Sequence, residues 1–269
     1  MSKKDEMSFL QHLEELRWHL IRSCIAIVLV AVAAFLFKEF IFDVLILGPK
    51  SKEFFSYRWF CSIAQTIGQE SSFCSEDLPF RIQSRTVSGQ FSAHMWTSIL
   101  AGFIVAFPYV LYEFWRFISP GLYEKERKNA RGFIFIASLL FFIGVLFGYY
   151  VVTPLSVNFL GTYRVSEQVF NDFDLSSYIG LLRASVLASG LIFELPIIIY
   201  FLTKVGLVTP DFLKKNRKIS LVIVLTLSAI ITPPDIASQI IVSIPILILY
   251  EISIVISKIV YKRITHNSP

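Results

Sequence analysis

Long stretches without a charged residue dominate the pattern of polar and apolar positions along the chain. Residues 86–112 form one run of 27 uncharged residues, and residues 132–163 form another of 32. A helix needs about 20 predominantly apolar residues to cross a bilayer, so each run is long enough for one span. The pattern therefore predicts an integral membrane protein.

Six transmembrane helices account for the apolar segments of the chain. We expect them at about 19–37, 91–117, 132–153, 178–203, 219–231 and 236–257, with a long outer loop over 38–90. The alternation of these segments with short polar ones favours a single membrane domain over residues 1–269, built as an all-α bundle.

The last two spans are short. Pro233 and Pro234 end a helix that begins after Lys218. A helix over 219–231 covers only about 20 Å of a hydrocarbon core that is about 30 Å thick. A single re-entrant hairpin over 219–257 is the alternative, but we favour two spans with local thinning of the bilayer.

Composition and charge support this topology. Hydrophobic residues make up 55% of the chain, charged residues 17%, and the mean hydropathy is +0.64. Seventeen of the 25 lysines and arginines lie before residue 23, in 116–131, in 204–218 and after residue 257. The positive-inside rule then places both termini in the cytoplasm. Because the net charge of +5 follows from this distribution, it does not indicate binding to nucleic acid.

The sequence shows no set of residues for catalysis. It has no glycine-rich nucleotide loop and no HExxH motif, and no nucleophile–base set for an intramembrane hydrolase. His12, Glu15 and His19 share one helical face, but this spacing is more typical of a solvated polar face than of a metal site. We expect no enzymatic activity, no metal and no cofactor.

Cysteines, glycines and prolines give structural predictions. Cys61 and Cys74 both lie in the outer loop, so a disulfide is expected there, with two free thiols as the alternative. Gly144 and Gly148 favour close helix packing inside the bundle over a dimer interface. Prolines within or at the ends of spans should kink or end their helices: Pro108, Pro154, Pro196 and Pro245.

The carboxylates carry most of the functional information. Glu15 lies in "HLEELR" and Glu126 in "SPGLYEKERK", both in basic cytoplasmic segments. From these residues alone, the simplest interpretation is that each pairs with a neighbour such as Arg17 or Arg127.

Three further polar groups lie within spans: Glu194, Gln239 and Glu251. Ionisable groups at such depth usually face a bundle interior or a wet cavity and indicate function. A secondary transporter that uses Glu194 and Glu251 would fit the topology, although the spans show no obvious inverted repeat.

Several of these motifs together resemble the TatC family, the signal-peptide receptor and core subunit of the twin-arginine protein translocase. The motifs are "HLEELR" at 12–17, "YEFWRFISPGLYEKER" at 112–127, "FGYYVVTPLSVNFL" at 147–160, "FELP" at 193–196 and "TPPDIASQ" at 232–239. The resemblance runs from about residue 8 to residue 260. The loop over 50–85 looks longer than is typical of the family.

The resemblance implies a fold and a recognition site. The fold is a cupped, glove-like bundle of six helices in the bacterial cytoplasmic (inner) membrane, with both termini in the cytoplasm. The site binds the twin-arginine motif of signal peptides on folded cargo through Glu15 and Glu126, with Arg17 and Arg127 placed to position these carboxylates. Paired guanidiniums suit fixed carboxylates, since such charge-assisted bonds are short and strong.

The resemblance also implies partners. Single-span subunits of the TatA and TatB type would dock near the fifth span and at the polar groups Glu194, Gln239 and Glu251, in an oligomeric complex driven by the proton-motive force. In the outer segments, Pro49 and Asp235 are expected to have structural roles.

Overall fold

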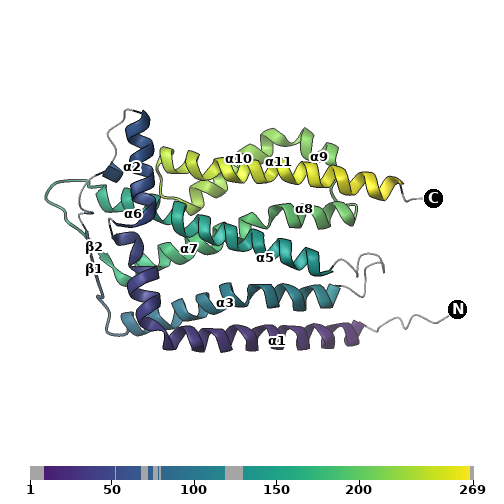
Figure 1. Ribbon diagram of the computed structural model, residues 1–269, viewed down its shortest axis with the longest axis horizontal. Coiled ribbons are helices and arrows are strands. Elements are labelled where there is room, and N and C mark those ends of the chain that lie inside the picture. The colour runs from purple at the N-terminus through teal and green to yellow at the C-terminus, as the bar shows by residue number, and fades with distance from the viewer. Residues whose placement is uncertain are drawn as a thin grey trace. The chain divides into compact units, whose positions relative to one another are not determined.

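The structure is a computed structural model that describes residues 9–51, 53–67, 72–74, 78, 80–118 and 130–266. The chain forms two compact units. The first contains residues 1–38 and 91–139, and the second contains residues 39–90 and 140–269. The described residues are nearly all helical (Figure 1), as the long apolar segments predict.

The first unit is built on two long helices, α1 (Phe9–Leu36) and α3 (Gly89–Ile118), which lie side by side in Figure 1. Gly102 allows their close approach, because a Cβ atom there would lie 2.6 Å from the carbonyl oxygen of Ile27. Near the other end of α1, the Phe35 ring stacks on His94 with 3.8 Å between centroids. The first part of α5 (Ala130–Phe147) completes this unit.

The second unit contains the remaining helices. After α5 come the π-helical turn η5 (Gly148–Val152), α6 (Thr153–Thr162), α7 (Leu175–Phe193), α8 (Leu195–Lys204), α9 (Pro210–Lys215), α10 (Arg217–Ile231) and α11 (Ile236–His266). Its apolar core joins four of these elements through Val152, Leu155, Val224 and Val242. Burial of these side chains holds the end of the third span against α10 and α11.

Gly144 and Gly148 pack against α7 in this unit. A Cβ atom at Gly144 would lie 2.6 Å from the Ser189 carbonyl oxygen, and one at Gly148 would lie 2.7 Å from that of Ser185. The interpretation of this pair as a close helix-packing site within the bundle is confirmed.

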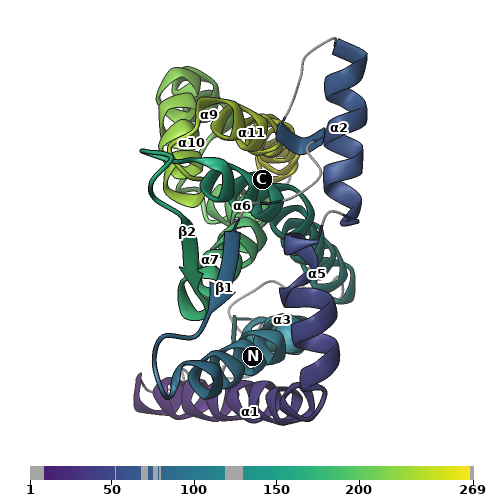
Figure 2. The ribbon, with the colours of Figure 1, turned by 90° about the vertical axis from the view of Figure 1, so that its left-hand side faces the viewer.

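The segments of the second unit that are expected on the outer side of the membrane, called the outer segments, are a mixture of short elements. They are the π-helical η1 (Phe40–Ile46), the 3-10 turns η2 (Gly48–Lys50) and η3 (Ser72–Cys74), helix α2 (Phe55–Ile67), and strands β1 (Phe80–Gln83) and β2 (Asn171–Asp174). The strands pair in parallel, from Phe80 opposite Asn171 to Gln83 opposite Asp174 (Figure 2). This small sheet departs from the all-α expectation. Strand β1 precedes α3 and strand β2 follows α6, so only the folded chain brings the two strands together.

Prolines interrupt some spans and not others. Pro196 follows a break at Glu194, where α7 ends and α8 begins, and Pro154 lies in the first turn of α6. Pro108 and Pro245 lie inside the continuous helices α3 and α11. The predicted helix boundaries therefore occur at Pro154 and Pro196, and kinks at Pro108 and Pro245 stay a prediction.

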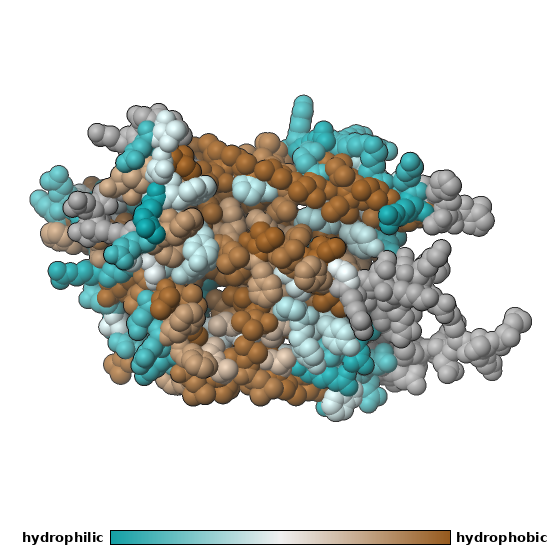
Figure 3. Space-filling view, in the orientation of Figure 1, coloured by the Kyte–Doolittle hydropathy of each residue, from teal (hydrophilic) through white to brown (hydrophobic). Residues whose placement is uncertain are grey.

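Among the described residues, five helical segments are long and apolar enough to cross a membrane. They are Leu13–Leu36, Gly89–Ile118, Gly132–Thr162, Leu175–Lys204 and Ser238–Ile264. Figure 3 shows apolar side chains along α11 and hydrophilic ones around α9. With 15 residues, α10 is only about 22 Å long, so the sixth span remains a prediction.

Candidate functional site

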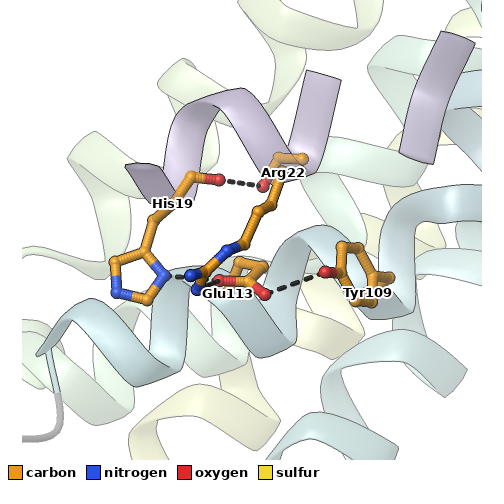
Figure 4. Close-up of polar contacts among 5 residues, drawn as sticks. His19, Arg22, Tyr109 and Glu113 are labelled. Carbon is orange, nitrogen blue, oxygen red and sulfur yellow. Dashed lines mark hydrogen bonds and ion pairs between the residues drawn. The ribbon is translucent and has the colours of Figure 1, made fainter. Parts of the chain in front are cut away.

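A buried carboxylate lies at the centre of a polar cluster in the first unit. Glu113, near the end of α3, has only 2% of its side chain exposed. His19 of α1 contacts it through Nδ1, and the Tyr109 hydroxyl donates to Oε1 over 2.9 Å (Figure 4). Arg22 Nη1 lies 3.9 Å from Oε2. The cluster thus joins α1 to α3 through one carboxylate.

Electrostatics explain why Glu113 has these partners. Burial removes the water that would otherwise solvate this carboxylate, which disfavours its charged form. Donors from His19 and Tyr109 replace that water. Because a buried charge without its partner costs about 3–5 kcal/mol, the cluster holds α1 firmly in one register on α3.

Glu15 lies on the same face of α1 as this cluster. It precedes His19 by four residues and Arg22 by seven, so the three side chains follow one another along the helix. Glu15 is partly exposed, and within the described part of the chain its carboxylate has no ion pair with Arg17, which is exposed. The pairing suggested by the sequence alone is therefore not seen. Glu126 and Arg127 lie outside the described residues.

Sequence reasoning missed Glu113, Tyr109 and the contact of His19. The available signal was that Glu113 ends an uncharged run of 27 residues, which places it within a predicted span. Applying the rule for intramembrane carboxylates to this residue would have identified it as a functional candidate. His19 was considered only in a metal set, and the described residues contain no group of side chains that could hold a metal ion.

In the second unit, Glu194 is buried where α7 meets α8. The residue is 8% exposed, and its Oε1 atom has no hydrogen-bond partner among the described residues. Its backbone carbonyl accepts hydrogen bonds from the N–H groups of Ile197 and Ile198, which start α8. Its neighbours Ile192 and Leu195 pack against the core shared with α10 and α11. Protein, not a lipid-facing surface, therefore surrounds this carboxylate.

The other two intramembrane candidates lie apart from each other on α11. The Gln239 side chain donates from Nε2 to the Leu225 carbonyl oxygen over 3.0 Å, which ties α11 to α10. Glu251 is 12 residues further along α11, about 18 Å away. Its carboxylate accepts from Arg217 Nη2 over 2.7 Å, and both side chains are 53% exposed. The three candidates do not form one cluster.

The outer residues make structural contacts. The Pro49 carbonyl oxygen accepts from the Tyr57 hydroxyl over 2.7 Å, and burial raises the pKa of that hydroxyl well above its usual range. Asp235 caps α11 by accepting from the Ser238 backbone N–H over 2.8 Å. Cys61 and Cys74 are joined as a disulfide between α2 and η3.

The two outer segments also meet at Asp174. Its carboxylate accepts backbone hydrogen bonds from Arg85, at 3.1 Å, and from Ser176, at 2.9 Å. These bonds lower the pKa of Asp174, because they stabilise the charged form. Asp174 thereby caps α7 and holds Arg85, the second residue after β1, close to it.

Known proteins resemble the chain along nearly its whole length. The profile of the family described as TatC, Sec-independent protein translocase protein (TatC), matches residues 11–245. The Sec-independent protein translocase protein TatC of Blattabacterium sp. subsp. Periplaneta americana (strain BPLAN) is 44% identical over 263 residues, covering 97% of this chain and 99% of the relative. TatCy of Bacillus subtilis (strain 168) is 32% identical over 266 residues, covering 99% and 94%.

Solved structures agree. A crystal structure described as the twin arginine translocase receptor TatC superposes with a TM-score of 0.68 at 32% identity, covering 93% of this chain and 99% of that one. A second, of the same receptor in DDM, gives a TM-score of 0.69 at 33% identity. These similarities favour a protein translocase over the secondary transporter considered from the sequence.

Proposed function

Because the chain belongs to the TatC family of Sec-independent protein translocase proteins, we propose that it is the receptor for twin-arginine signal peptides. Members of this family are multi-pass membrane subunits of a protein translocase and not enzymes. Further proposals concern orientation and location: both termini lie on the cytoplasmic side of a bacterial inner membrane, as the distribution of lysine and arginine indicates.

The position of Glu15 carries this proposal. Its carboxylate is partly exposed and has no ion pair among the described residues, so it can accept hydrogen bonds from an incoming guanidinium. Together with Glu126 it would provide two acceptors for two adjacent arginines. Bidentate bonds of this kind distinguish arginine from lysine, whose ammonium group is a point charge.

The buried cluster around Glu113 would position this site. His19 lies one helical turn from Glu15 and is held by Glu113, so the α1 backbone beneath Glu15 cannot rotate without breaking a buried hydrogen bond to a carboxylate. Arg17 and Arg127 would then adjust the field around the two carboxylates. In this view Glu113 is a positioning residue that does not contact the peptide.

Peptide binding tests the proposal. Glu15→Gln should weaken binding of a twin-arginine peptide to the detergent-solubilised protein by about 1–3 kcal/mol, the range for charge-assisted hydrogen bonds. Glu14→Gln is the matched control, because Glu14 is exposed on a different face of the same helix. Equal binding of Arg-Arg and Lys-Lys peptides by the unchanged protein would contradict the proposal.

We further propose that single-span subunits of the TatA and TatB type dock beside α10 in an oligomeric complex that uses the proton-motive force. In support, α10 presents an exposed apolar face with Ile219, Val222 and Ile223. The neighbours of Glu194, Ile192 and Leu195, pack against the core that α10 shares, and Glu194 itself has an unsatisfied oxygen. Glu194→Leu should reduce cross-links from Val222 to such subunits and export of a folded reporter, and Glu194→Gln should do so less. Unchanged cross-links and export with Glu194→Leu would remove this role.

A further inference from the structure

Helix α2 divides its surface into three faces. The first face is buried against the rest of the second unit and contains Ser56, Tyr57 and Phe60, none more than 8% exposed. The second is polar and exposed, with Arg58, Ser62 and Gln65. The third is apolar and exposed, with Phe55, Trp59 and Ile63 at 62%, 51% and 39%. A helix at the surface of a soluble domain needs only the first two faces.

The direction of α2 indicates how the third face is oriented relative to the bilayer. In both Figure 1 and Figure 2 its axis is transverse to those of α7 and α11, which belong to the same unit. Because α7 and α11 belong to membrane-spanning segments, α2 runs roughly along the plane of the bilayer. Its 13 residues extend about 20 Å in that direction.

The exposed apolar face is continuous with the surface of the third span. Ile143, Leu146 and Tyr150 are exposed at helical spacing along that span. The Tyr150 ring stacks on Phe54, with 5.5 Å between centroids, and Phe55 follows directly. A lipid-facing stripe therefore leads from the span into the first turn of α2.

We propose that α2 is an interfacial helix whose Phe55–Trp59–Ile63 face lies in the boundary between the headgroups and acyl chains of the adjoining leaflet. Tryptophan prefers this depth, and helices with one apolar and one polar face bind there in the bilayer plane. The buried face then contacts protein, the polar face water, and the third face lipid. Lipid is the occupant because the stripe it extends already faces lipid. This inference does not rest on peptide binding by Glu15.

Spin labels on adjacent positions of α2 test the proposal. The full chain carries Cys24→Ser to remove its free thiol, keeps the Cys61–Cys74 disulfide, and is reconstituted into lipid vesicles at a high lipid-to-protein ratio. Trp59→Cys and Ile63→Cys report on the apolar face, and Arg58→Cys and Gln65→Cys are the matched controls at exposed positions of the polar face. Each label is measured for collisions with oxygen and with a water-soluble nickel chelate.

Labels at 59 and 63 should collide several-fold more with oxygen than with the nickel chelate, and the ratio should reverse at 58 and 65. High accessibility to the nickel chelate at all four positions would overturn the proposal, because the face would then be hydrated. Shielding of 59 and 63 from both reagents would also overturn it, since a polypeptide would then cover the face. Phe55→Cys repeats the measurement one turn earlier if Trp59→Cys does not fold.

Discussion

Removal of the Glu113 carboxylate should destabilise the first unit strongly. Hydrogen bonds to a charged group contribute about 1.5–3 kcal/mol each, and Glu113 accepts from His19 and from Tyr109. Because Arg22 is 46% exposed and 3.9 Å away, it adds about 0–1 kcal/mol. Tyr109 is 41% exposed and can recover part of its loss from water. We therefore expect Glu113→Ala to lower the free energy of unfolding by about 3–5 kcal/mol.

Equilibrium unfolding in mixed detergent measures this change, and two neighbouring tyrosines provide a matched pair. Tyr109→Phe removes a donor to Glu113 and should cost about 1.5–3 kcal/mol. Tyr112→Phe removes a hydroxyl from an equally exposed ring whose contact with Arg116 involves only the ring face, and should cost less than about 0.5 kcal/mol. If Glu113→Ala and Tyr109→Phe were both as mild as Tyr112→Phe, the buried cluster would not hold α1 in place.

Three other predictions concern the second unit and the start of α5. Cys61 and Cys74 should resist alkylation without reductant, while Cys24 should react. Reduction of the disulfide should lower the stability of the outer segment by about 3 kcal/mol in the chain-entropy model. Labelling of both Cys61 and Cys74 without reductant would contradict the bridge. Because its pKa is lowered on folding, Asp174 should stabilise the protein fully above about pH 3.9, and this contribution should disappear as the pH falls through the lowered value. Asp174→Asn should remove that part of the pH dependence of unfolding, and an unchanged acid profile would exclude it. Gly144→Ala should lower thermal stability, because the added Cβ atom would lie 2.6 Å from the Ser189 carbonyl oxygen. Gly132→Ala is the control and should not lower it, since no atom lies within 4 Å of a Cβ there. Equal stability of the two variants would show that the helices separate easily.

The sequence predicts the helices well because each helix is determined by the residues within it. A long run without charges must satisfy its backbone hydrogen bonds internally in a bilayer, and a helix does so at every position. This argument does not depend on which helices pack together. It therefore predicts the spans at 178–203 and 236–257, where the structure has α7–α8 and α11, and the break beside Pro196. Gly144 and Gly148 were likewise read correctly, since small residues one turn apart favour a close helix contact wherever the partner lies.

What sequence missed depends on partners that are distant along the chain. His19 and Glu113 are 94 residues apart, so neither residue alone indicates that the other completes its hydrogen bonds. Strand β1 pairs with a segment about 90 residues later. Phe80–Gln83 does alternate apolar and polar side chains, but a run of four residues is the shortest that can indicate a strand and does not identify its partner. In both cases tertiary contacts, not local preference, decide the structure.

The parallel pairing of β1 with β2 has a mechanical consequence. Strand β2 ends at Asp174 and α7 begins at Leu175, so no flexible linker separates the sheet from the fourth span. A force on the segment that contains β1 would therefore act on α7 through the hydrogen bonds between the strands. Helix α7 is about 28 Å long and ends at the break beside Glu194. Through the strand ladder, a displacement of the segment that contains β1 would act directly on the first turn of α7.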